Sequence, residues 1–155
     1  MSLSHRLTHA TKQWKASLVG HSDSNGDEDT GHLRVTYANN HWQNINSRAP
    51  SVRFGTVHVV NNYYETLLNS GINARQGAQL LVQSTAFVDA GEKAIFFADS
   101  DETGYVVVDD VDLGGSSNSV PEGTFTPDSL PYPAIELLGS ASVASAVPAG
   151  AGQTL

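Results

Sequence analysis

The feature that most constrains the fold is an internal repeat of 22 to 23 residues, marked by Trp42, Tyr64 and Phe87. Other residues recur in step with these aromatic ones: Val35/Tyr37, Val57/Val59 and Leu80/Val82, then Asn39-Asn40 and Asn61-Asn62, then Arg53-Phe54-Gly55 and Arg75-Gln76-Gly77. A fourth copy, with Val106 and Val111, is degraded. Each unit contains short alternating runs typical of β-strands, without the longer 3.6-residue period of a helix.

A strand-only repeat of this length predicts a solenoid of stacked β coils. Coils in register place equivalent residues about 4.8 Å apart and bury the apolar positions as continuous columns. Asn62 is then expected to stack beneath Asn40 at a bend, where Asn tolerates a left-handed backbone. An antiparallel sandwich competes, but it gives no reason for polar residues to keep step with apolar ones. We therefore predict an all-β parallel β-helix of about four to five coils.

Two regions break the period. From Gly20 to its expected equivalent Gly55 is 35 residues, which is one repeat of 22 plus an insertion of 13. The surplus falls at residues 21–30, a polar loop. After Gly114 the composition turns to Gly, Ser, Pro and Ala, which indicates an irregular tail with a short helix near residues 141–146. The expected organisation is a single partial β-helix domain over residues 1–155. Its parts are an unmatched segment at 1–12, coils at 13–113 and a tail at 114–155 that packs on the solenoid.

Composition excludes several classes of protein. The chain has no Cys, so it has no disulfide, no thiolate metal site and no Cys nucleophile. A formal net charge of −8 argues against a nucleic-acid partner. No apolar run approaches the roughly 20 residues that span a bilayer, so no membrane association is expected. The first six residues lack the apolar core of a signal peptide. We expect a monomer.

The basic residues suggest a binding face. All eight lie at or before position 93, whereas residues 94 to 155 contain nine acids. Coils in register bring Lys15, Arg48 and Arg53 to one face, with Arg75 one rung further. Like charges within roughly 5–10 Å repel one another, so folding gains nothing from this cluster unless an anionic partner binds. In the alternative, each cation pairs with a local acid or extends into solvent.

Other sites have weaker support. Asp23, Asn25, Asp27 and Asp29 alternate as in a calcium loop, but Glu28 and Arg34 stand where an EF-hand needs Gly and Glu, so we expect a solvated loop. The histidines lack zinc-binding spacings, and they are His5, His9, His21, His32, His41 and His58. No Gly-x-Ser-x-Gly motif supports a Ser/His/Asp triad.

At these residues the sequence resembles the pectate lyases of polysaccharide lyase family 1, most of all the fungal members. The resemblance is carried by WKASLVGHSD (14–23), DTGHLRVTYANNHWQNINSRAPSVRFGTVHVVNNYYE (29–65) and SGINARQGAQLLVQSTAFV (70–88). Weaker similarity continues to AGQTL (151–155). The most specific motif is Arg-x-Pro-x-x-Arg at residues 48–53. The resemblance covers roughly residues 13–155 and corresponds to the C-terminal half of such an enzyme.

The resemblance implies a right-handed parallel β-helix that cleaves polygalacturonate, a (1→4)-α-D-galacturonan, by β-elimination. The family's catalytic base falls on Arg48, which takes the C5 proton, and its substrate-binding residues fall on Lys15 and Arg53. Calcium is the implied cofactor, bridging enzyme aspartates to the substrate carboxylate. An arginine with a reference pKa near 12.5 is neutral in only about 10⁻⁴ of molecules at pH 8.5. Neighbouring cations would therefore have to disfavour its charged form, and the rate should rise into alkaline pH.

The family's calcium-binding aspartates lie on coils before the WKASL segment, whereas the first Asp of this chain is Asp23. We therefore expect a truncated lyase with weak or no activity alone, whose calcium ligands lie upstream. A secreted location is implied by the family. Two alternatives remain open: a pectin lyase that acts on methyl-esterified substrate without calcium, and an inert fragment that only binds acidic polysaccharide.

Overall fold

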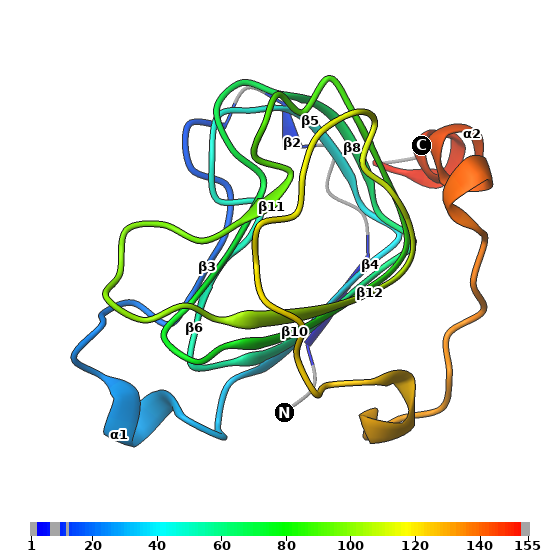
Figure 1. The fold of residues 1–155 in the computed structure, drawn as a ribbon. Helices are drawn as coiled ribbons and strands as arrows, with labels where there is room; N and C mark the ends of the chain where they lie inside the picture. Colours follow the sequence, from blue (N-terminus) through cyan, green and yellow to red (C-terminus); the bar gives the residue numbers. More distant parts are fainter. Residues whose placement is uncertain (1–2, 7–9, 12, 153–155) are drawn as a thin grey trace.

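The computed structural model describes residues 3–6, 10–11 and 13–152, with side chains from residue 13 onward. The chain winds into a parallel β-helix, seen end-on in Figure 1, and all the pairings between its described strands are parallel. Periodic strand segments with buried columns therefore build the predicted fold class.

The strands form three ladders, each built from one position in successive coils. The first ladder contains β1 (Leu3–Arg6), β4 (Arg34–Ala38), β7 (Thr56–Val60), β10 (Gln79–Val88) and β12 (Tyr105–Asp112). The second contains β2 (Ala10–Thr11), β5 (His41–Ile45), β8 (Tyr63–Leu67) and the end of β10. The third contains β3 (Leu18–Val19), β6 (Ser51–Arg53), β9 (Ile72–Arg75) and β11 (Ile95–Phe96). β10 serves two ladders because it bends at Ser84, whose φ is 47°.

The solenoid has about three turns, fewer than the four to five coils expected. These turns are β4–β5–β6, β7–β8–β9 and β10–β11. Val106 of the degraded fourth repeat does pair with Leu80, but β12 continues only the first ladder. The expected count treated this partial repeat as a complete coil.

The aromatic repeat forms the predicted buried column. The rings of Trp42 and Tyr64 stack with centroids 5.6 Å apart, and those of Tyr64 and Phe87 stack at 4.4 Å. The Tyr64 and Phe87 side chains are completely buried. The column lies in the second ladder, so the same aromatic contact is made at successive rungs and resists slippage of one coil against the next.

The asparagine pairs also stack, although with a different division of roles. Asn62 Oδ1 accepts hydrogen bonds from the Trp42 indole at 3.0 Å and from the Asn40 backbone N–H at 3.3 Å, and these confirm that Asn62 lies against Asn40. The left-handed residues are instead the preceding ones, Asn39 with φ 57° and Asn61 with φ 52°. Within each pair the first Asn turns the backbone and the second satisfies buried polar groups.

The register of the first described coil differs from the expected one. Val19 pairs with Val52, which places Gly20 beside Arg53 instead of Gly55. The shift of 33 leaves an insertion of 11 residues over the repeat of 22, not 13. A Cβ on Gly20 would lie 2.9 Å from Arg53 Cβ, and the φ of Gly20 is +75°. Gly20 is thus needed where the chain leaves β3 close to the Arg53 backbone.

Residues before the WKASL segment also belong to the ladders, although no repeat predicted this. β1 pairs with β4 and β2 with β5, through backbone groups that do not require a matching sequence. Residues 1–2, 7–9 and 12 of the segment that we called unmatched lie outside the described residues.

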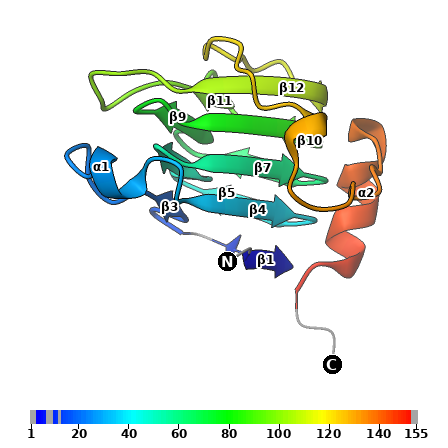
Figure 2. The same ribbon diagram turned by 90° about the horizontal axis from the view of Figure 1, so that it is seen from below.

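Two segments lie outside the coils. The insertion contains α1 (Gly26–Asp29) and projects from one side of the solenoid in Figure 1. The tail contains η1 (Pro127–Ser129) and α2 (Ser140–Gly150), and Figure 2 shows α2 beside the stacked strands. Val143 and Val147 of α2 bury against Tyr63 and Ala86. Over the described ranges no helix combines the length and apolar character needed to cross a bilayer.

Candidate functional site

A groove of about 260 Å³ runs beside the third ladder, where the chain turns into β6, β9 and β11. Among the described residues its lining holds four basic side chains and one acidic one, namely Lys15, Arg48, Arg75, Lys93 and Asp99. Three of the basic residues come from turns and one comes from a strand. The groove therefore concentrates positive charge on a protein whose net charge is negative.

Backbone pairing brings Lys15 and Arg48 together. Lys15 forms a parallel bridge with Ser47, and the Ser17 N–H donates to the Arg48 carbonyl at 2.8 Å. Lys15 is exposed and Arg48 is half-buried, and both line the groove. Two of the three predicted cations therefore share one groove, even though the predicted register of the Gly20 segment was wrong by two residues.

Arg48 has a left-handed backbone, with φ 60°. The same conformation occurs at Asn44, Phe54, Thr66 and Gln76, which also lie at the ends of coil segments. It is the usual turning device of this solenoid, and its occurrence at Arg48 is not by itself a sign of catalytic strain.

The third predicted cation, Arg53, lies one strand further and does not line the groove. Its Nε donates a short hydrogen bond to Asp23 Oδ1, and its Nη1 donates to the Gly20 carbonyl at 3.0 Å. The Arg53 side chain is 11% exposed. The alternative raised from the sequence, that a cation pairs with a local acid, is therefore true of Arg53.

Arg75 takes the groove position beside Arg53, one rung along, and pairs with it in the β6–β9 register. Its side chain is 4% exposed. Its guanidinium donates to the Asp99 carbonyl at 3.1 Å, and ion pairs join it to Asp23 at 3.8 Å and to Asp99 at 3.9 Å. The two carboxylates compensate the cost of burying this charge next to Arg53.

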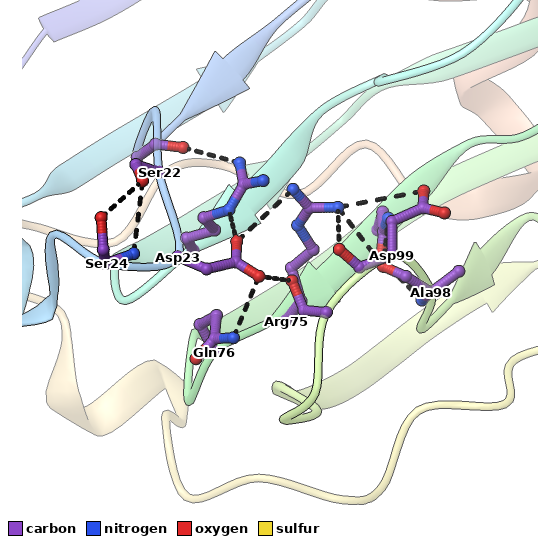
Figure 3. Close-up of polar contacts among 11 residues, drawn as sticks. Ser22, Asp23, Ser24, Arg75, Gln76, Ala98 and Asp99 are labelled. Carbon is purple, nitrogen blue, oxygen red and sulfur yellow. Dashed lines mark hydrogen bonds and ion pairs between the residues drawn. The ribbon is translucent and has the colours of Figure 1, made fainter.

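Asp23 is the functional residue that the sequence analysis missed, because the insertion was interpreted as a solvated loop. Figure 3 shows its carboxylate between the guanidinium groups, with hydrogen bonds from Gln76 at 3.2 Å and Ser100 at 2.7 Å. The hydrogen bond from Arg53 is the main reason that the pKa of Asp23 is lowered from 3.8. The correct pairing of Gly20 with Arg53 would have placed Asp23 near this position.

The residues present do not form a calcium site. Throughout the described ranges, no three His, Asp or Glu side chains lie close enough together to hold a metal ion. Asp99, the one acid lining the groove, is engaged with Arg75, and Asp23 is engaged with Arg53. Calcium prefers six to eight oxygen ligands, so this donor set does not suit it.

A larger hollow of about 520 Å³ lies elsewhere, between the first ladder and the tail. His58 and Tyr132 both line it, with His58 Nδ1 and the Tyr132 hydroxyl 2.6 Å apart, and Thr36 lies 2.8 Å from the same hydroxyl. Its polar groups are thus satisfied by one another and attach the tail to the solenoid.

Comparison with known proteins agrees with this fold and groove. Residues 2–153 match the pectate lyase family. The chain belongs to this family. A probable pectate lyase B of Aspergillus flavus is 68% identical over 148 residues, which cover 96% of this chain. That alignment covers 45% of the relative, so the chain spans about half the length of the pectate lyases that it matches.

Solved pectate lyases have the same solenoid. Pectate lyase II of Xanthomonas campestris pv. campestris is 30% identical with a TM-score of 0.78, and the match covers 92% of this chain and 46% of that one. A Bacillus pectate lyase in complex with trigalacturonate is 29% identical with a TM-score of 0.75, covering 90% and 45% of the two chains. The parallel β-helix of this chain is therefore that of the pectate lyase family.

Proposed function

We propose that this chain carries the basic half of a pectate lyase site, which cleaves (1→4)-α-D-galacturonan by β-elimination. The observation that carries the proposal is that Lys15 and Arg48, from different coils, line one cationic groove. Family membership supports the reaction, and the Bacillus relative in complex with trigalacturonate supports the substrate class.

The groove suits a polyanion. Its four basic residues outnumber its one acid, and concentrated positive charge attracts carboxylates and raises the rate of encounter. Lys15 would hold a galacturonate carboxylate, as the resemblance implies. Holding the sugar in this way fixes the C5–H bond relative to Arg48, which is the positioning that a proton abstraction requires.

The elimination would proceed from Arg48. A neutral Arg48 guanidine takes the proton from C5, and the electrons of the C5–H bond form a double bond between C4 and C5. The C4–O bond breaks, and the departing glycosidic oxygen takes a proton from solvent. Negative charge builds up beside the substrate carboxylate in the transition state, where Lys15 and Arg75 would stabilise it.

Arg53 remains a proposed substrate-binding residue, with a specific requirement. Because Asp23 occupies its Nε, Arg53 can hold a substrate carboxylate only if Asp23 shares the guanidinium or moves away. We propose that Asp23 keeps Arg53 aligned before substrate arrives, since Gly20 fixes the same guanidinium from the other side.

Calcium, a secreted location and a monomeric state belong to the proposal only through the family resemblance. Since the described residues do not suit the ion, no step above passes through it. Polygalacturonate is the proposed partner.

The test measures the ultraviolet absorbance of the unsaturated product when the purified chain is given polygalacturonate. Arg48→Ala is expected to abolish turnover while preserving much of the affinity, since it removes the base. Arg34→Ala is the control, because this exposed arginine of β4 lies beside the other hollow and should leave turnover unchanged.

Three results would contradict the proposal in distinguishable ways. Equal turnover in wild type and Arg48→Ala would remove Arg48 from catalysis. Binding of polygalacturonate without turnover by the wild type would support the inert binding fragment. Faster turnover of methyl-esterified pectin, unaffected by chelator, would support a pectin lyase.

A further inference from the structure

Arg48, Ser70 and Lys93 occupy equivalent positions on three successive coils. The Ala49 N–H donates to the Gly71 carbonyl at 3.1 Å, and the Gly71 N–H donates to the Lys93 carbonyl at 2.8 Å. The β6–β9 and β9–β11 registers give the same correspondence. All three residues line the groove. One column therefore presents a cation, a small hydroxyl and a second cation along the solenoid axis.

We propose that Lys93 binds a further carboxylate of the polyanion that Arg48 and Lys15 engage, which adds a subsite two coils along the groove. This inference rests on the proposed function for its ligand class, an oligomer of uronic acid. It assigns to Lys93 a binding role that neither the repeat nor the Arg-x-Pro-x-x-Arg motif predicted.

The charge of Lys93 is available for a ligand. Its side chain is exposed, and within the described part of the chain it takes part in no salt bridge. Its Nζ lies 5.9 Å from the centre of the Phe96 ring. A contact of this kind directs the flexible side chain over the groove without neutralising it.

The spacing favours two carboxylates over one. Two rungs of a parallel ladder separate the backbones of Arg48 and Lys93 by about 10 Å, which is too far for both residues to hold one carboxylate with extended side chains pointing the same way. Ser70 between them is buried and small, so the path along the column stays open. A ligand that carries carboxylates at intervals matches this pattern, whereas a single sugar acid does not.

The neighbouring charges point in the same direction. Arg75 and Lys15 line the same groove, so Lys93 adds to a positive field that Asp99 only partly offsets. Collecting these charges opposes folding through mutual repulsion, and an anionic ligand spanning the groove relieves it.

The experiment compares the binding of hexagalacturonate and digalacturonate to the full chain by titration calorimetry. Lys93→Gln is expected to weaken hexagalacturonate binding about fivefold, the effect of losing one exposed ion pair. Digalacturonate binding, centred on Arg48, should stay within twofold. Lys93→Arg should restore hexagalacturonate binding because it keeps the charge. Glu92→Gln is the matched control, since it changes the charge of the adjacent exposed residue without touching the groove.

The inference is overturned if Lys93→Gln weakens both oligomers equally, or if it weakens neither. It is also overturned if wild-type chain binds neither oligomer. Binding is measured without turnover, so a chain that binds hexagalacturonate through Lys93 but releases no unsaturated product refutes the proposed reaction and leaves this subsite intact. Thermal unfolding of each variant verifies that the fold is retained.

Discussion

Replacing Asp23 with Asn removes a negative charge from between two guanidinium groups while preserving the size of the side chain. The carboxylate accepts hydrogen bonds from Arg53, Gln76 and Ser100, and an ion pair joins it to Arg75. In Asp23→Asn the partly buried Arg53 loses its only carboxylate partner among the described residues. Arg75, which is 4% exposed, keeps Asp99 and two carbonyl oxygens.

The expected loss in free energy of unfolding is about 2 kcal/mol at neutral pH. Hydrogen bonds to charged groups contribute about 1.5–3 kcal/mol when shielded, and exposed ion pairs contribute about 0.2–1 kcal/mol. The Asp23 side chain is 39% exposed, so solvent screens part of each contribution and the sum lies between these limits. For a chain of this length, such a loss lowers the melting temperature by about 4–8 °C.

The effect should depend on pH in a defined direction. The Arg53 hydrogen bond holds the pKa of Asp23 below 3.8 in the folded state, so the unfolded chain takes up this proton first as the pH falls. The stabilisation is present above about pH 4 and is lost as the pH falls through the lower folded value. The difference between wild type and Asp23→Asn should therefore shrink in acid.

The assay is thermal unfolding followed by circular dichroism from pH 7 down to pH 3. Asp27→Asn is the control, because Asp27 is exposed in the same loop and has no salt bridge among the described residues. If Asp23→Asn costs no more than Asp27→Asn at pH 7, or if its cost is undiminished at pH 3, the reasoning is refuted.

Two further predictions concern buried polar groups. Tyr64→Phe should raise stability by about 1 kcal/mol in urea unfolding, because the Tyr64 hydroxyl is buried without a partner among the described residues and Phe87 already fills the equivalent place one coil along; a loss of stability would show that the hydroxyl is satisfied. Burial lowers the pKa of His58, so the folded chain stays neutral there while the unfolded chain is protonated near pH 6.5. Wild type should therefore lose stability between pH 7 and 5.5 more steeply than His58→Gln, and equal slopes would contradict this.

The sequence was sufficient to predict the stacking of the coils. Trp42, Tyr64 and Phe87 recur at the spacing of one turn, and burial of such columns together with parallel backbone pairing produces a solenoid almost independently of the rest of the chain. Periodicity failed at the ends, because backbone hydrogen bonds continue the ladders through β1 and β12 whether or not the side chains repeat.

The sequence also led to the shared position of Lys15 and Arg48, since neighbouring coils must lie about 4.8 Å apart wherever the register is set. Only the tertiary structure decided which cations remain available. The insertion returns Asp23 to Arg53, and no repeat governs where a loop of 11 extra residues places a carboxylate. Local periodicity determines which backbones are neighbours, whereas the pairing of charges depends on distances across segments that do not repeat.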